Sequence, residues 1–146
     1  MMTHSLSSLP SILSVDDDRL IHLLIERMLS DRCRLFIALN AEEALSQLLH
    51  QKIDLLLLDV SMPGISGLEL CRIVRQLPHC EKIPIIMLTG RNSPFDRVQG
   101  CLAGATEYLT KPFQPNELCQ IVDRYLGTSA CHSTCVLDDR TSIANR

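Results

Sequence analysis

Residues 53–59, Ile-Asp-Leu-Leu-Leu-Leu-Asp, form an almost uninterrupted apolar run that stops at an acid. Length alone does not separate a buried strand from a buried helix in such a run. Helical patterns flank it on both sides, and each can open with a capping box, formed by Asn40 and Glu43 in one case and by Ser66 and Glu69 in the other. Its place between two amphipathic helices favours a strand that is buried on both faces.

The same alternation continues along the chain. Apolar runs predict five strands, at residues 12–15, 33–39, 53–58, 83–88 and 106–109. A helical pattern follows each strand, and the last helix runs from about Pro115 to Leu126, with Gly127 as its stop. Strands that are apolar throughout belong to a parallel sheet with helices on both sides. The predicted fold class is therefore α/β, a single doubly wound (βα)5 domain with a five-stranded parallel sheet.

Composition narrows the functional classes. The 146 residues suffice for one domain, and the net charge of -3 argues against a broad nucleic-acid surface. No segment has the roughly 18 consecutive apolar residues of a membrane span, and the first ten residues lack the pattern of a secretory signal. The seven cysteines are an odd number and several lie on apolar stripes. We expect a cytoplasmic protein with no direct nucleic-acid binding and no membrane insertion.

Unusual residues follow the predicted strands. Asp16 and Asp17 follow the first strand, Asp59 the third, Thr89 the fourth and Lys111 the fifth, and a parallel sheet brings its strand ends to one rim. Three carboxylates at one rim repel one another unless a cation such as Mg²⁺ intervenes. The lysine and the hydroxyl can neutralise charge on a transferring phosphoryl group, with the central carboxylate as nucleophile.

Each residue also has a plainer interpretation. Asp18 is expected to cap the first helix, and Asp54 to have a structural role. Thr89 alone could be a β-favouring residue, Lys111 a solvated turn residue and Tyr108 a core residue. A rim shared by three acids costs stability, however, and therefore indicates a function.

Four motifs, in this order and spacing, resemble the receiver domain of two-component response regulators, and in particular a stand-alone, chemotaxis-regulator-like one. They are Val15-Asp16-Asp17-Asp18, Leu58-Asp59-Val60-Ser61-Met62-Pro63-Gly64, Met87-Leu88-Thr89-Gly90 and Tyr108-Leu109-Thr110-Lys111-Pro112-Phe113. The resemblance covers roughly residues 10 to 127. It implies the flavodoxin-like strand order 2-1-3-4-5 and a Lys111–Pro112 peptide bond that is usually cis in the family. We therefore expect a flexible N-terminus at 1–10, a receiver domain at 11–127 and a disordered tail at 128–146.

The resemblance also implies a Mg²⁺ cofactor and a set of ligands for it. Asp59 matches the phosphoacceptor, and Asp17 and Asp59 match side-chain ligands of the ion. Asp16 is expected to act through water, and the backbone carbonyl of Ser61 completes the set.

Further positions match residues that act on the phosphoryl group. Thr89 and Lys111 match the residues that grip its oxygens, and Tyr108 matches the aromatic switch position. Ser61 and Arg91 match the two positions that tune hydrolysis of the aspartyl phosphate.

The implied function is that of a phosphoacceptor switch in a two-component phosphorelay. The donor would be a histidine kinase or phosphotransfer protein. We expect no enzymatic activity beyond self-phosphotransfer and autodephosphorylation. The output would run to an unknown downstream protein through the face formed by the fourth helix, which begins at Ser93-Pro94, the strand at 106–109 and the helix at 115–126.

Other functions are weighed against this one. A receiver fold that acts only as an unphosphorylated scaffold is the main alternative, although all five site positions are kept. A haloacid dehalogenase-type enzyme needs a second acid two residues after its nucleophile, where Ser61 follows Asp59. A flavodoxin would cradle a phosphate where Asp16 to Asp18 would repel it. Cys131, His132 and Cys135 could offer zinc ligands, but a disordered tail is preferred. His22, His50 and His79 are scattered, with no partner that suggests a base or a phosphorelay site.

Overall fold

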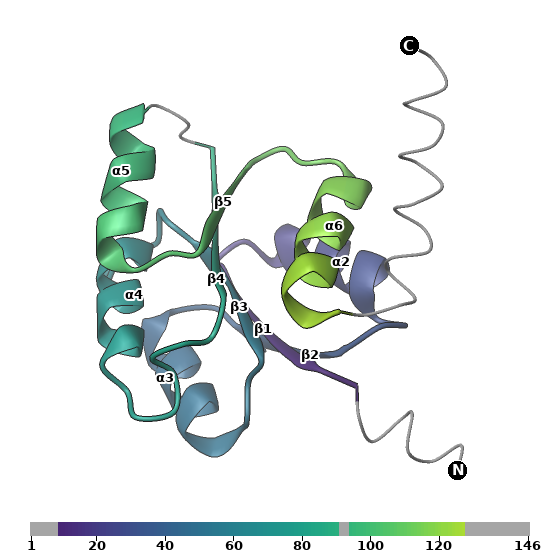
Figure 1. Ribbon diagram of the computed structural model, residues 1–146, viewed down its shortest axis with the longest axis horizontal. Helices are drawn as coiled ribbons and strands as arrows, with labels where there is room; N and C mark the ends of the chain where they lie inside the picture. Colours follow the sequence, from purple (N-terminus) through teal and green to yellow (C-terminus); the bar gives the residue numbers. More distant parts are fainter. Residues whose placement is uncertain (1–8, 91–93, 128–146) are drawn as a thin grey trace.

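Five parallel strands form one sheet in a computed structural model that describes residues 9–90 and 94–127 (Figure 1). The sheet order is β2-β1-β3-β4-β5, which confirms the predicted fold class and the order that the family resemblance implies. The strands are β1 (Ser11–Val15), β2 (Arg34–Ala38), β3 (Leu55–Asp59), β4 (Ile85–Thr89) and β5 (Glu107–Thr110). Each lies within two residues of its predicted position at either end.

Five helices cover the two faces of the sheet. They are α2 (Arg19–Leu29), α3 (Ala41–His50), α4 (Gly67–Arg75), α5 (Pro94–Ala103) and α6 (Pro115–Leu126). Figure 1 shows α3, α4 and α5 on one face and α2 and α6 on the other. Each face has its own apolar cluster, one including Leu70, Val74 and Met87, and the other including Ile25, Leu57 and Leu118. The architecture is therefore three layers, with the sheet in the middle.

Burial along the strands follows their place in the sheet. Every residue of β1, β3 and β4 is buried, because helices cover both faces of these central strands. The edge strands β2 and β5 are only partly buried. The run of four leucines in β3 therefore lies at the centre of the core.

Local signals in the sequence set several element ends. The Asp18 carboxylate caps α2 by accepting from the Leu20 N–H at 2.9 Å. Asn40 caps α3 in the same way, and Gly127 ends α6 in the left-handed conformation with φ 66°. Asp54 accepts from the backbone N–H of Ser11 at 2.8 Å and so has the structural role expected of it.

The buried face of α2 differs from the face that apolar spacing suggests. Helical spacing of apolar residues predicts a buried stripe formed by Leu20, Ile21, Leu24, Ile25 and Met28, yet Leu20 and Leu24 are 68% and 47% exposed. The face that packs on the sheet contains His22, Ile25 and Leu29. Because α2 is apolar at most positions, its pattern fits more than one rotation about the helix axis.

Some predictions fall on residues outside the described ranges. These are the N-terminus up to residue 8, Arg91, Ser93 and the whole tail at 128–146 with Cys131, His132 and Cys135. Among the helices of the described residues, none has the length and apolarity needed to cross a bilayer.

Candidate functional site

The carboxyl ends of the central strands and β5 bring acids and a lysine to one rim. Asp59 is the last residue of β3, Asp16 directly follows β1, and Lys111 directly follows β5. Backbone hydrogen bonds fix two of these ends: the Asp16 N–H donates to Ala38 at 3.1 Å and the Lys111 N–H donates to Thr89 at 2.7 Å. The site is therefore built on the sheet itself, where parallel α/β folds place their ligands.

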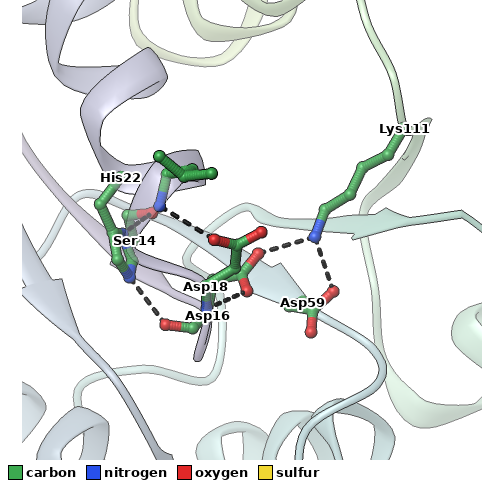
Figure 2. Close-up of polar contacts among 7 residues, drawn as sticks. Ser14, Asp16, Asp18, His22, Asp59 and Lys111 are labelled. Atoms are coloured by element: carbon green, nitrogen blue, oxygen red, sulfur yellow. Dashed lines mark hydrogen bonds and ion pairs between the residues drawn. The ribbon is translucent and has the colours of Figure 1, made fainter.

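The Lys111 ammonium lies between two buried carboxylates (Figure 2). Its Nζ is 2.7 Å from Oδ2 of Asp16 and 3.0 Å from Oδ1 of Asp59. The two carboxylate side chains are only 2% and 8% exposed, and the lysine side chain is 22% exposed. Each bond is charge-assisted and poorly solvated, so the lysine holds both acids in place.

Asp17 completes a cluster of three acids. Ligand atoms of Asp16, Asp17 and Asp59 lie within 4.8 Å of one another, and Asp17 is exposed whereas the other two are buried. Hard carboxylate oxygens, with solvent access on one side, are what Mg²⁺ prefers, since it keeps several of its waters. The residues at the rim therefore fit the ion that the sequence motifs imply.

The carboxylates at the rim repel one another, so the site needs cations to balance their negative charge. Burial raises the pKa of Asp59; the hydrogen bond from Lys111 opposes this, and the charges of Asp16 and Asp17 add to it. Burial lowers the pKa of Lys111, but its hydrogen bonds to Asp16 and Asp59 outweigh burial, so its pKa is raised. Lys111 therefore keeps its positive charge, whereas burial makes the negative charge of the neighbouring Asp59 energetically unfavourable.

Two other residues that the sequence predicts to belong to the site, Thr89 and Ser61, lie at or just beyond the carboxyl ends of their strands. Thr89 is the last residue of β4, 1% exposed, and its strand neighbour in β5 is Thr110, directly before Lys111. Ser61 is exposed, two residues beyond Asp59 in the segment that leads to α4. The peptide bond between Lys111 and the following proline is cis, as the family resemblance implies.

Tyr108 lies away from the acids, in the middle of β5. Its hydroxyl donates to the backbone carbonyl of Asp96 in α5 at 3.1 Å. The Arg97 guanidinium lies 5.5 Å from the centre of its ring. The ring is partly buried against the α3–α5 face of the core. The tyrosine thus joins β5 to the start of α5.

Comparison with known proteins assigns the family. The family described as response regulator receiver domain matches residues 12–123. The chain belongs to the receiver domain family. Receiver domains serve two-component signalling and carry its phosphoacceptor, and they are signalling domains rather than conventional enzymes.

Relatives and solved structures agree with this family. The phosphate regulon transcriptional regulatory protein PhoB of Rhizobium meliloti (strain 1021) is 41% identical over 111 residues, which are 75% of this chain and 49% of that protein. The chain thus spans about half the length of the curated relatives it matches.

Among solved structures, the Vibrio cholerae chemotaxis protein CheY4 superposes with a TM-score of 0.78 and 32% identity, covering 82% of this chain and 100% of that one. The receiver domain of the sensor histidine kinase PA1611 from Pseudomonas aeruginosa PAO1 has a TM-score of 0.75 and 31% identity, covering 82% of this chain and 98% of that one. That structure is described with a magnesium ion coordinated in its active site cleft.

Gly67, the first residue of α4, is a site residue of this receiver domain that the motifs did not single out. A Cβ at this position would collide with the carbonyl oxygen of Asp59 and lie 2.8 Å from the Cα of Val60. The Gly67 N–H also donates to the Val60 carbonyl at 2.9 Å. Only a residue without a side chain lets α4 begin so close to the end of β3. A glycine at the first turn of a predicted helix, eight residues after a strand-end acid, was the signal available in the sequence.

His22 is the second residue that sequence reasoning missed. The sequence analysis considered it only as a base or a phosphorelay site, whereas in the structure its ring is buried and bonded to both Ser14 and Asp16. Its spacing from Ile25 and Leu29, at i+3 and i+7, was the available signal that it faces the sheet. A serine within an apolar strand was the second signal, because a buried hydroxyl needs a partner.

Proposed function

We propose that this receiver domain, residues 11–127, accepts a phosphoryl group on Asp59 and acts as a switch in a two-component phosphorelay. The observation that carries the proposal is the position of Asp59. It ends the central strand β3, its side chain is 8% exposed, and it contacts the Lys111 ammonium at 3.0 Å. Asp16 and Asp17 stand beside it. A carboxylate in this setting can be presented as a nucleophile while charge around it is balanced.

The transfer step forms one bond and breaks one. A carboxylate oxygen of Asp59 attacks the phosphorus of a phosphohistidine in the donor protein, the P–N bond breaks, and the donor imidazole leaves with that electron pair. The product is an acyl phosphate on Asp59. Lys111 and the Thr89 hydroxyl are proposed to bind the phosphoryl oxygens, and these two residues would supply positioning and charge stabilisation.

A Mg²⁺ ion bound by Asp17, Asp59 and the Ser61 carbonyl, with Asp16 acting through water, would neutralise charge on the phosphoryl oxygens. The three-acid cluster within 4.8 Å and the magnesium described in the PA1611 receiver domain support this assignment. Lys111 already balances part of the acidic charge through its two ion pairs. Part of the negative charge of the three acids remains unbalanced, and we therefore expect the reaction to require Mg²⁺.

The output face is proposed to lie on α5, β5 and α6. The acyl phosphate carries about two negative charges, one more than the carboxylate that it replaces; this charge draws the Thr89 hydroxyl toward it and moves the segment after β4. Tyr108 then moves into the space left behind, which breaks its bond to the Asp96 carbonyl at the start of α5. α5 also exposes two apolar side chains, Val98 at 53% and Leu102 at 73%. A downstream protein that binds this face would sense the change.

The remaining assignments complete the proposal. The phosphoryl donor is a histidine kinase or phosphotransfer protein, and the protein acts in the cytoplasm. Ser61 and Arg91 tune hydrolysis of the aspartyl phosphate, because they hold the positions two residues after the phosphoacceptor and two residues after the switch threonine.

The experiment that tests the proposal is phosphorylation by acetyl phosphate and Mg²⁺, followed by intact mass measurement. We expect the wild-type protein to gain one phosphoryl group and Asp59→Asn to gain none. Asp54→Asn is the matched control, because Asp54 is a structural acid next to the opposite end of β3, bonded to Ser11. An unmodified wild type would favour the scaffold alternative, in which the fold serves without phosphorylation.

A further inference from the structure

A buried histidine supports the acidic rim from behind (Figure 2). His22 lies on α2 and its side chain points toward the end of β1, where the residue is 3% exposed. Its Nε2 is 2.7 Å from the backbone carbonyl oxygen of Asp16, and its Nδ1 is 3.0 Å from Oγ of Ser14. The histidine therefore joins α2 to β1 at the residue that opens the acidic cluster.

Hydrogen bonds hold Asp16 at every polar atom. Its N–H donates to the Ala38 carbonyl at 3.1 Å, and its Oδ1 accepts from the Asp18 N–H at 2.9 Å. Its Oδ2 accepts from Lys111 at 2.7 Å. The bond from His22 to the carbonyl oxygen is the fourth, and it comes from a side chain rather than from the strand ladder. This bond therefore holds the backbone of Asp16 in place, one residue beyond the end of β1.

The Asp16 carbonyl is part of the peptide plane that joins Asp16 to Asp17. Since that unit is planar, a partner that fixes the carbonyl oxygen also fixes the direction of the Asp17 N–H and the start of the Asp17 backbone. The carboxylates of both residues belong to the cluster within 4.8 Å. The orientation of this one plane therefore sets how the two acids are presented.

We infer that His22 is a positioning residue for the divalent cation site. It acts through the backbone of Asp16 and touches neither the ion nor the phosphoryl group. The inference rests on the proposed function in that it takes the acids at the rim to be the site of a Mg²⁺ ion. Groups that orient metal ligands from behind typically change metal affinity by about 10- to 100-fold when they are lost.

Ser14 assists by selecting the tautomer of the ring. A carbonyl oxygen can only accept, so Nε2 of His22 carries the hydrogen that points to Asp16. Nδ1 is then an acceptor for the Ser14 hydroxyl, which is itself buried in β1. A hydrogen bond to one ring nitrogen fixes which nitrogen donates, so Ser14 holds the ring in its donating form.

The test compares His22→Gln with His22→Met in titrations of the purified full chain with Mg²⁺ alone. The Gln amide nitrogen is as many bonds from Cα as Nε2 of histidine and can donate to the same carbonyl, whereas Met has similar length and no donor. We expect H22M to raise the Kd for Mg²⁺ about tenfold or more and H22Q to stay within about threefold of wild type. Ser14→Ala should raise the Kd about threefold, which corresponds to one ordinary hydrogen bond.

Ile25→Val is the matched control, because Ile25 is fully buried on the same face of α2, three residues further on. It loosens the packing of α2 and should leave the Kd for Mg²⁺ unchanged. The inference is overturned if H22M binds Mg²⁺ within twofold of wild type, or if I25V weakens binding as much as H22M does. Should H22M lack a cooperative unfolding transition, S14A decides: an unchanged Kd in S14A overturns the inference.

The outcome also separates this inference from the proposed function. A wild type that binds Mg²⁺ but takes no phosphoryl group from acetyl phosphate refutes phosphoacceptance and leaves the role of His22 standing. A wild type that is phosphorylated, together with an H22M variant of unchanged Mg²⁺ affinity, refutes the role of His22 alone. A wild type that binds no Mg²⁺ overturns the positioning role.

Discussion

Replacing Lys111 with methionine removes the ammonium that bridges two buried carboxylates. At an effective dielectric constant of about 20, the contacts at 2.7 and 3.0 Å to Asp16 and Asp59 correspond to about 6 kcal/mol of gross attraction each. Desolvation offsets most of this, and breaking a buried ion pair costs about 3–5 kcal/mol in practice. Because the lysine side chain is 22% exposed, we expect the lower end, about 3 kcal/mol at pH 7 without divalent cation.

Protonation of a carboxylate limits that loss. Placing a proton on an aspartate with an ordinary pKa of about 3.9 costs about 4 kcal/mol at pH 7, and this cost falls by about 1.4 kcal/mol for each pH unit. At pH 5 the penalty of an unpaired carboxylate cannot exceed about 1.5 kcal/mol, because the group takes up a proton instead. Lys111→Met should therefore lose most of its stability deficit between pH 7 and pH 5.

Urea unfolding in the presence of a chelator, at both pH values, measures the effect. Lys52→Met is the control, since Lys52 is exposed, and it should change the free energy of unfolding by no more than about 0.5 kcal/mol. A K111M deficit below about 1 kcal/mol at pH 7, or one that stays the same at pH 5, would refute the electrostatic account of the rim.

Three other perturbations have defined outcomes. Without divalent cation, Asp59→Asn should be more stable than wild type by about 1 kcal/mol at pH 7 in urea unfolding. Burial raises the folded pKa of Asp59, so its ionisation opposes folding as pH rises through that pKa, and the advantage should vanish below the unfolded pKa of about 3.9; a less stable D59N at pH 7 contradicts this. Mg²⁺ at about 100 times its Kd should raise wild-type stability by about 2.7 kcal/mol in the same assay, and no change would argue against a cation site. Gly67→Ala must widen a 2.8 Å approach to Val60 to at least 3.4 Å, so we expect a loss of about 1–3 kcal/mol and slower phosphorylation. Gly90→Ala, where a Cβ meets nothing within 4 Å, is the control, and equal stability of the two variants would contradict the clash.

Much of the fold was predictable because the central strands carry a clear physical signal. The four leucines of β3 are buried on both faces, as in a covered parallel strand, and the amphipathic helices on either side of the run favoured a strand over a buried helix. The order of the strands in the sheet could not be predicted in this way, because the pattern of apolar residues identifies the strands but does not show which strands are neighbours. The strand order was inferred from the family resemblance instead. The apolar pattern of α2 also left its rotation open, and Leu20 proved to be exposed.

The acids and Lys111 could be predicted to meet because each follows a strand, and parallel strand ends share one rim. His22 and Gly67 were missed for a different reason. His22 acts through a backbone carbonyl, and Gly67 matters for the space it leaves empty beside Asp59. The spacing of these residues in the sequence indicates only that His22 faces the sheet and that Gly67 lies in the first turn of a helix; it does not indicate what either residue contacts. These contacts depend on the distance between a helix and a strand end, which only the structure supplies.

The most direct test of the central claim is to locate the acyl phosphate chemically. The wild-type protein is treated with acetyl phosphate and Mg²⁺, reduced with borohydride, digested and sequenced by tandem mass spectrometry. Borohydride converts an aspartyl phosphate to homoserine, so the modified residue is marked permanently. The account predicts homoserine at Asp59 alone, dependent on Mg²⁺. Homoserine at Asp16 or Asp17 instead, or no homoserine at all, would contradict it.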